Sequence, residues 1–197
     1  MKKFNKKDLV TIPNLMGYFR ILLIPLFCWL YLRADTQVEY LYATIVVLVS
    51  SLTDLFDGMI ARKFNQVTEF GKILDPVADK LTHAALAVCL AIKHPIVWAL
   101  IGLMAVKEGY MAIMGAYFLK KGKMIDGAMW YGKVCTASLF VVLLVLFLFP
   151  NLPDLAIYIM VGVLMAIMLY TLVRYIILYT KMLKELKNEK EEVKIEE

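Results

Sequence analysis

The chain alternates between long apolar stretches and short polar breaks. Apolar runs of about 20 residues, the length that crosses a bilayer as a helix, occupy residues 14–33, 38–62, 71–92, 96–119, 128–149 and 154–179. The breaks between them carry polar residues, and the last break, Pro150-Asn151-Leu152-Pro153, contains two prolines, which cannot continue a helix interior. The pattern predicts an all-α integral membrane protein with six transmembrane helices, forming a single domain over residues 1–197.

Composition and charge support this prediction and give it an orientation. Hydrophobic residues make up 61% of the 197 residues, against about 45–50% apolar residues in a soluble domain. With six spans, most basic residues fall on the side of the termini, whereas Arg33 and Lys93 fall on the other. Since Lys and Arg remain on the cytoplasmic side, we expect both termini in the cytoplasm and the protein in the cell membrane. The basic residues on the terminal side are Lys2, Lys3, Lys6, Lys7, Arg62, Lys63, Lys72, Lys120, Lys121, Lys123 and the lysines from Lys181 onward.

The two ends of the chain are polar. Residues 1–12 form a basic segment next to the first span, which either lies on anionic headgroups or acts as a topology signal. Residues 181–197 mix charges of both signs at helical spacing. We therefore expect a charged cytoplasmic tail that continues the last helix.

Four aspartates lie where the second predicted span ends and the third begins. Asp54 and Asp57 are three residues apart and Asp75 and Asp79 are four apart, so each pair lies on one face of its helix. Acidic residues in a span are costly and usually functional, and the short connection over 63–70 makes the two helices neighbours. Carboxylate oxygens suit Mg²⁺, Mn²⁺ or Ca²⁺ rather than zinc. We expect one or two divalent cations, Mg²⁺ or Mn²⁺, at these aspartates.

Small residues and an arginine accompany the aspartates. Gly58, Ala61 and Gly71 would let a bulky, flat group approach the backbone, and Arg62 can hold a phosphate by two parallel hydrogen bonds. Together with a metal ion they describe a site for a nucleotide diphosphate. The alternative is that the small residues only allow close packing of helices.

The full pattern D-x2-D-G-x2-A-R-x8-G-x3-D-x3-D closely resembles the signature of the CDP-alcohol phosphotransferases, integral membrane enzymes of phospholipid synthesis. The similarity extends from Ile12-Pro13-Asn14 to about Arg174. It implies transfer of a phosphatidyl group from CDP-diacylglycerol to an alcohol acceptor with release of CMP, by a homodimer. It also implies that Asp79 is the general base. Metal ligands would be Asp54, Asp57, Asp75 and Asp79, and contacts to CDP would come from Asp57, Gly58, Ala61, Arg62, Gly71 and Asn14.

Basic residues in the later spans suggest the acceptor. A lysine deep in a span is rarely accidental, and Lys107, Lys133, Arg20 and Arg174 could together form a pocket for an anionic group such as glycerol 3-phosphate. The chain is most similar to the phosphatidylglycerophosphate synthase branch of the family, which usually has arginines where Lys107 and Gly115 stand. The alternatives are the related branch that uses phosphatidylglycerol and makes cardiolipin, and other acceptor branches.

A cation transporter is an interpretation from another class, because intramembrane aspartates can conduct ions. It leaves Gly58, Ala61 and Arg62 unexplained, and the first, fifth and sixth predicted spans have no acidic residue in their interiors. A catalytically silent scaffold would not need the full set of motif residues. We therefore expect an enzyme whose partners are the bilayer, a CDP-lipid, an alcohol and a second copy of the chain, and no nucleic acid.

Overall fold

The computed structural model describes residues 10–196 except 65, 67, 69 and 123–128, and it does not describe the side chains of residues 62, 72, 187 and 189–196. Most of the basic segment predicted at 1–12 therefore lies outside the described residues. The described part forms helices joined by short turns, without a strand. The prediction of an all-α fold is confirmed. The helices are α1 (Ile12–Arg33), α2 (Gln37–Lys63), α3 (Gly71–Lys93), α4 (Val97–Lys120), α5 (Trp130–Leu148) and α6 (Asp154–Glu196).

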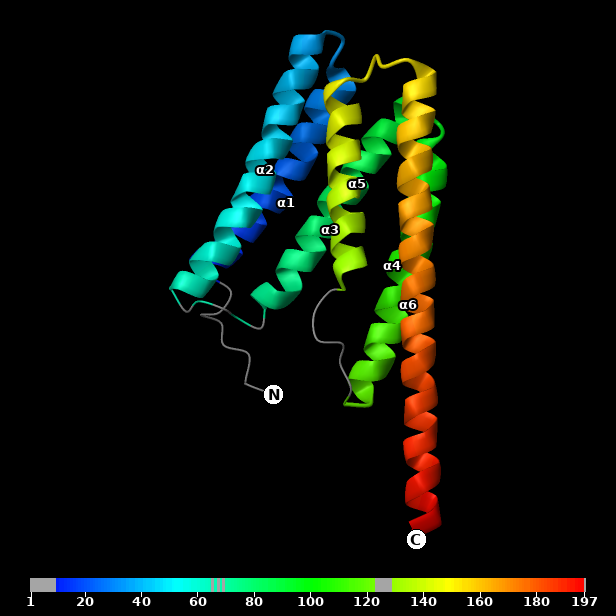
Figure 1. Ribbon diagram of the computed structural model, residues 1–197. Coiled ribbons are helices and arrows are strands. Elements are labelled where there is room, and N and C mark those ends of the chain that lie inside the picture. Colours follow the sequence, from blue (N-terminus) through cyan, green and yellow to red (C-terminus); the bar gives the residue numbers. More distant parts are fainter. Residues whose placement is uncertain (1–9, 65, 67, 69, 123–128, 197) are drawn as a thin grey trace.

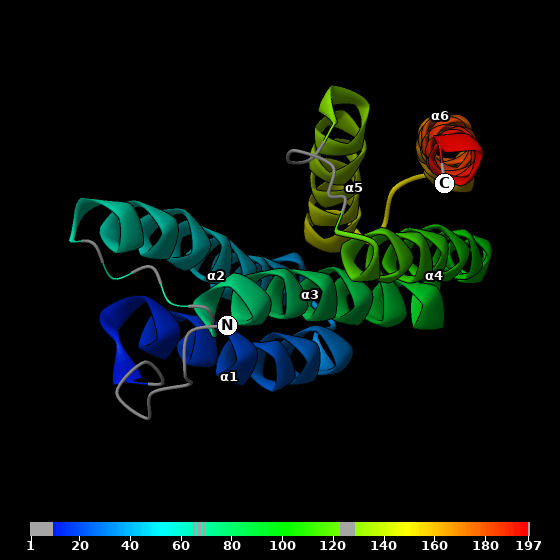
Figure 2. The same cartoon turned by 90° about the horizontal axis from the view of Figure 1, so that it is seen from below.

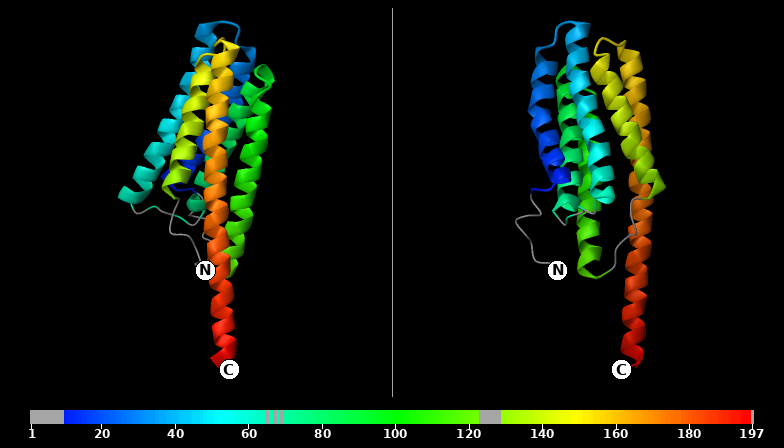
Figure 3. Two further views of the ribbon diagram at one scale, coloured as in Figure 1. Left: turned by 45° about the vertical axis from the view of Figure 1, so that its right-hand side comes forward. Right: turned by 90° about the vertical axis from the view of Figure 1, so that its left-hand side faces the viewer.

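The helices run alternately up and down in a bundle, and α6 continues well past its end (Figure 1). Helix α1 packs against α2 and α3, while α6 packs against α4 and α5. Seen from below, α1–α3 and α4–α6 form two groups, and α3 packs on both α4 and α5 (Figure 2). Two further views show α6 running beside α4 and then projecting beyond it (Figure 3). Helix α3, together with the contact between α2 and α5, thus joins the two groups.

Five helices are long and apolar enough to cross a membrane: α1, residues 37–61 of α2, α4, α5 and residues 154–186 of α6. These helices make the chain a membrane protein. The remaining helix, α3, has 23 residues, but Lys72, Asp75, Asp79 and Lys80 interrupt the apolar pattern in its first half. The prediction of six spans stays a prediction, because the third predicted span, at 71–92, is this charged helix.

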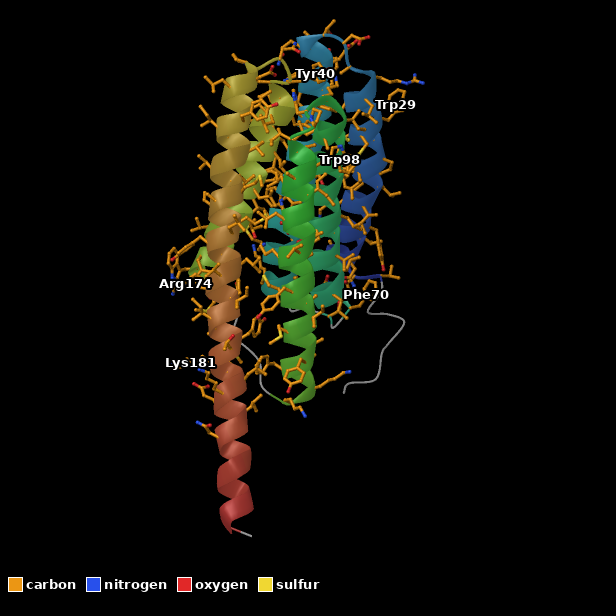
Figure 4. All side chains as sticks on the ribbon, turned by 90° about the vertical axis from the view of Figure 1, so that its right-hand side faces the viewer. Trp29, Tyr40, Phe70, Trp98, Arg174 and Lys181 are labelled. Carbon is orange, nitrogen blue, oxygen red and sulfur yellow. The ribbon has the colours of Figure 1, made fainter. Side chains whose placement is uncertain are left out.

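Apolar side chains fill the half of the bundle away from these charges. Phe27, Tyr31, Leu90 and Leu143 are among the fully buried members of this core. Tyr31 stacks on Phe147 with ring centroids 4.0 Å apart, and the Lys93 ammonium donates a hydrogen bond to the Tyr40 hydroxyl. Figure 4 places Tyr40 with Trp29 and Trp98 at the end of the bundle opposite to Phe70. A closed core at that end leaves the cavities described below at the other.

Candidate active site

A buried arginine on α1 holds the first aspartate pair on α2. Arg20 is 2% exposed; its Nη1 donates to Asp54 Oδ1, and its Nη2 donates to Asp57 Oδ2 over 2.9 Å. The side chain of Asp57 is buried as well, whereas that of Asp54 is 43% exposed. Because Asp54 and Asp57 lie on one face of α2, a single guanidinium reaches both. Arg20 supplies the positive charge that two neighbouring carboxylates require.

The second aspartate pair, on α3, belongs to the same electrostatic cluster. Asp75 and Asp79 both interact electrostatically with Arg20 and with Asp54, so the structure brings the four predicted carboxylates to one region. Within the described part of the chain, no three acidic, histidine or cysteine side chains lie close enough to hold one metal ion as they stand. The donor set still fits a hard divalent cation, since it is made of carboxylate oxygens alone. A cation there would share Asp54 and Asp57 with Arg20.

The glycines of the motif differ in their surroundings. A Cβ added to Gly58 would meet no atom within 4 Å, so helix packing does not explain a glycine at this position. A Cβ at Gly71 would lie 2.7 Å from Asn14 Oδ1 and 3.1 Å from Thr68 Oγ1. Asn14 donates a hydrogen bond to Thr68, whose hydroxyl also accepts the N–H of Gly71. Gly71 thus permits a close contact between α1 and the start of α3, whereas Gly58 borders open space beside Asp57.

Ala61 is half-buried on α2, one turn beyond Gly58. The side chain of Arg62 lies outside the described part of the chain, so its predicted phosphate contact stays a prediction.

A large cavity opens between α1, α2, α3 and α5. It has a volume of about 770 Å³, within the range of about 300–1,000 Å³ that is usual for small-molecule sites. Asp54 and Asp79 contribute carboxylates to its wall, and Leu55 and Phe140 contribute apolar surface. Ser50, Thr82 and Thr136 add hydroxyls. The cavity therefore combines charged groups with an apolar wall, as a substrate with a polar head and an apolar tail requires.

A smaller cavity of about 190 Å³ adjoins the larger one and extends toward α4 and α6. Lys107 is 3% exposed and donates to Glu108 Oε1 over 2.6 Å, while Lys80 donates to the other carboxylate oxygen. All three residues line this cavity. One carboxylate thus faces two ammonium groups. These three groups carry one net positive charge, which attracts an anion; the negative charge of Asp79, which also lines this cavity, is not included in this sum.

Asp79 lies where the two cavities meet. It lines both, as do His83, Gly132 and Thr136. His83 Nδ1 is 3.5 Å from Asp79 Oδ1, and its ring packs edge-on against Phe140 with centroids 5.9 Å apart. A carboxylate at this junction can reach groups bound on either side.

The four basic residues predicted for the acceptor lie in different places. Lys107 lines the smaller cavity, and Lys133 and Arg20 line the larger one. Arg174 is exposed on α6, with its guanidinium 5.4 Å from the Tyr131 ring centroid. Figure 4 shows Arg174 at the outer edge of the bundle. The structure brings Arg174 to neither cavity.

Sequence reasoning did not identify several of the lining residues. No motif marks Glu108 in the sequence, and its contact with Lys80 joins residues 28 positions apart. Ser50, Thr82 and Tyr175 carry no motif that separates them from other polar residues of apolar helices. Ser50 lies one turn before Asp54 and Thr82 one turn after Asp79, but these relations on a helix face mark them as lining residues only once the site is known.

A bundle of long apolar helices with clustered carboxylates, one of them at the junction of two cavities, is the arrangement expected of an enzyme that acts on an amphiphilic substrate. The sequence model of the CDP-alcohol phosphatidyltransferase family matches residues 10–183, and the chain belongs to this family. It is therefore a phosphatidyltransferase of phospholipid synthesis.

Individual relatives agree with the family. A protein of Escherichia coli strain K12 named CDP-diacylglycerol–glycerol-3-phosphate 3-phosphatidyltransferase is 35% identical over 146 residues, which cover 72% of this chain and 79% of that protein. Proteins of the same name from Shigella boydii serotype 4 and Shigella sonnei match with the same identity and coverage.

Proposed function

We propose that this enzyme transfers the phosphatidyl group of CDP-diacylglycerol to glycerol 3-phosphate and releases CMP. The observation that carries the proposal is the position of Asp79 at the junction of the two cavities. The larger cavity, with carboxylates and an apolar wall, suits CDP-diacylglycerol. The smaller cavity, with Lys80 and Lys107, suits a small anionic acceptor. The names of the E. coli and Shigella relatives support the same acceptor.

The reaction follows from these positions. Asp79 accepts the proton of the acceptor hydroxyl, whose oxygen bonds to the β-phosphorus of CDP-diacylglycerol. The bond between this phosphorus and the oxygen that bridges to the α-phosphate breaks, and CMP leaves with that oxygen. Holding both substrates at Asp79 replaces an encounter in solution by a reaction between aligned groups.

Divalent cations complete the proposed site. The ligands would be Asp54, Asp57, Asp75 and Asp79. When bound, Mg²⁺ or Mn²⁺ would supply Lewis-acid stabilisation of the charge on the diphosphate. Asp57 and Asp79 would serve both cation and substrate.

The CDP moiety would lie beside α2 and the start of α3. Gly58 would let the nucleotide approach the backbone of α2, as the open space beside it allows. Ala61, Arg62, Gly71 and Asn14 would border the same group.

The active site would face the cytoplasm. The end of α2 and the start of α3, which carry the aspartate pairs, lie at the same end of the bundle as the start of α1 and the end of α6 (Figure 1). Lys63 at the end of α2 and Lys120 at the end of α4 lie at that end as well. The positive-inside tendency then places both termini and the substrates, CDP-diacylglycerol in the membrane and the acceptor in solution, on the cytoplasmic side. A homodimer in the cell membrane completes the proposal.

The experiment is CMP release by the purified full-length protein with CDP-diacylglycerol and Mg²⁺ or Mn²⁺, against separate acceptors. We expect release with glycerol 3-phosphate, loss of release with a chelator and recovery when the cation is added back. Release only with phosphatidylglycerol, inositol phosphate or serine would contradict the acceptor and retain the family chemistry. No release with any acceptor would contradict the proposed function.

A further inference from the structure

Tyr175 of α6 lines the smaller cavity together with Asp79 of α3. Its side chain is 3% exposed and packs edge-on against Tyr131, with ring centroids 4.9 Å apart. The Tyr175 hydroxyl interacts with the backbone of Met129, just before α5. A phenol can both accept and donate hydrogen bonds, so the hydroxyl can also serve a group in the cavity.

Gly132 of α5 is what allows the hydroxyl to occupy this position. A Cβ at Gly132 would overlap the Tyr175 hydroxyl oxygen and lie 3.3 Å from the carbon that bears it. Gly132 itself lines both cavities. A glycine lowers the stability of a helix interior, so its occurrence in α5 has a steric reason here. The Tyr175 hydroxyl thus occupies the space that a side chain at position 132 would need.

We propose that Tyr175 is an acceptor-binding residue, whose hydroxyl donates a hydrogen bond to the phosphate of a small polyol phosphate held by Lys107. This inference rests on the proposed function and deepens it. The smaller cavity has a volume of about 190 Å³, whereas the sites of drug-sized ligands measure about 300–1,000 Å³. It therefore suits a small polar molecule. Lys107 supplies charge from α4, and Tyr175 supplies a directed donor from α6.

The alternative role for Tyr175 is packing alone, and Tyr175→Phe separates the two roles. The phenylalanine keeps the ring against Tyr131 and removes only the hydroxyl. We expect the KM for glycerol 3-phosphate to rise about tenfold or more, the loss typical of one hydrogen bond to a charged group. The KM for CDP-diacylglycerol should stay within about twofold. The matched control is Tyr158→Phe, since Tyr158 lies exposed on the same helix.

Gly132→Ala tests the contact between the two residues. The added methyl group displaces the hydroxyl, so the variant should show the raised acceptor KM and a lower unfolding temperature. The double variant Gly132→Ala with Tyr175→Phe removes the overlapping oxygen. It should regain most of the thermal stability while keeping the raised acceptor KM. Gly102→Ala is the control, because a Cβ there meets no atom within 4 Å.

A binding measurement completes the test. Glycerol 3-phosphate should protect the wild-type protein, loaded with the divalent cation and CMP, against thermal unfolding, and it should protect Tyr175→Phe less. If the wild type releases CMP but Tyr175→Phe keeps the wild-type acceptor KM and protection, the inference about Tyr175 is wrong and the proposed function stands. If the wild type releases no CMP with glycerol 3-phosphate, the result contradicts the proposed function and, with it, the inference about Tyr175 that rests on it.

Discussion

Arg20 of α1 donates a hydrogen bond from Nη2 to Oδ2 of Asp57 on α2 over 2.9 Å, and both side chains are almost completely buried. A buried ion pair is strongly destabilised when one partner is removed, because the remaining charge is left without compensation. The contact therefore makes the stability of the α1–α2 pair depend on a residue of the first predicted span. It also places a fixed cation next to the carboxylates that we propose as metal ligands.

Arg20→Met should lower the free energy of unfolding by about 3 kcal/mol or more, the usual cost of breaking a buried pair. Mn²⁺ should raise the unfolding temperature of the variant more than that of the wild type, because the ion restores positive charge beside Asp54 and Asp57. Thermal unfolding in detergent, with and without Mn²⁺, measures both effects. Arg33→Met, exposed at the other end of α1, is the control. Equal stability of variant and wild type would contradict a structural role for the pair.

Asp79→Asn should lower kcat by about 100- to 10,000-fold, since an amide cannot accept the proton of the acceptor hydroxyl. Binding of CDP-diacylglycerol, measured separately from turnover, should persist at reduced affinity. Asp154→Asn, at the start of α6 and far from the cavities, controls for the loss of one carboxylate. A variant with wild-type turnover would exclude Asp79 as the base.

Lys107→Gln should raise the KM for the acceptor at least tenfold and leave the KM for CDP-diacylglycerol nearly unchanged. The physical reason is that Lys107 lines only the smaller cavity. Lys107→Arg should recover part of the loss, because it keeps the charge and adds bidentate geometry. Steady-state kinetics with each substrate varied in turn gives the two constants, and Lys181→Gln on the exposed part of α6 is the control. A change confined to the CDP-diacylglycerol constant would mean that Lys107 serves the other substrate.

Gly58→Ala and Gly71→Ala should have opposite effects. A Cβ at Gly58 meets no atom, so the variant should be as stable as the wild type or gain up to about 1 kcal/mol in helix stability. Its affinity for CDP-diacylglycerol should nevertheless fall. Gly71→Ala should lower the unfolding temperature, because its Cβ would crowd Asn14 and Thr68. Thermal unfolding and CDP-diacylglycerol titration separate the two. Unchanged affinity for CDP-diacylglycerol in Gly58→Ala would contradict the proposal that the nucleotide occupies the open space beside Gly58.

The proposed orientation predicts which breaks are accessible from outside the cell. Single cysteines at Thr36 or Pro95, in a variant without the three native cysteines, should react with a membrane-impermeant thiol reagent on intact cells. A cysteine at Lys121 should react only after the membrane is opened. Labelling of the cysteine at Pro95 also decides whether α3 crosses the bilayer, because Pro95 follows the end of α3. It thus decides whether there are six spans. The opposite labelling pattern would reverse the orientation.

The sequence predicted the helices well because the signals were strong and local. The predicted first span at 14–33 is α1 at Ile12–Arg33, and the one at 71–92 is α3 at Gly71–Lys93. The apolar run predicted at 154–179 was expected to continue as a charged helix after Lys181, and α6 extends from Asp154 to Glu196. The charges after Lys181 end the apolar run without ending the helix, since Lys and Glu are good helix formers.

The site was predictable only as far as spacing along one helix determines position. The aspartate pairs share their helix faces, as their spacing of three and four residues requires. The basic residues predicted for the acceptor come from α1, α4, α5 and α6, and no local rule says which helix faces meet. Arg20 therefore lies with Asp54 and Asp57 rather than with Lys107, and Arg174 lies outside both cavities. Tertiary contacts, which a single sequence does not show, decide these placements.

The shared wall of the two cavities has a kinetic consequence. Because each cavity has space of its own and they meet at Asp79, neither substrate has to leave before the other arrives. Double-reciprocal plots at several fixed acceptor concentrations should then give intersecting lines, the pattern of a ternary complex. Parallel lines, the pattern of a covalent phosphatidyl-enzyme, are not expected from an arrangement in which donor and acceptor are bound together.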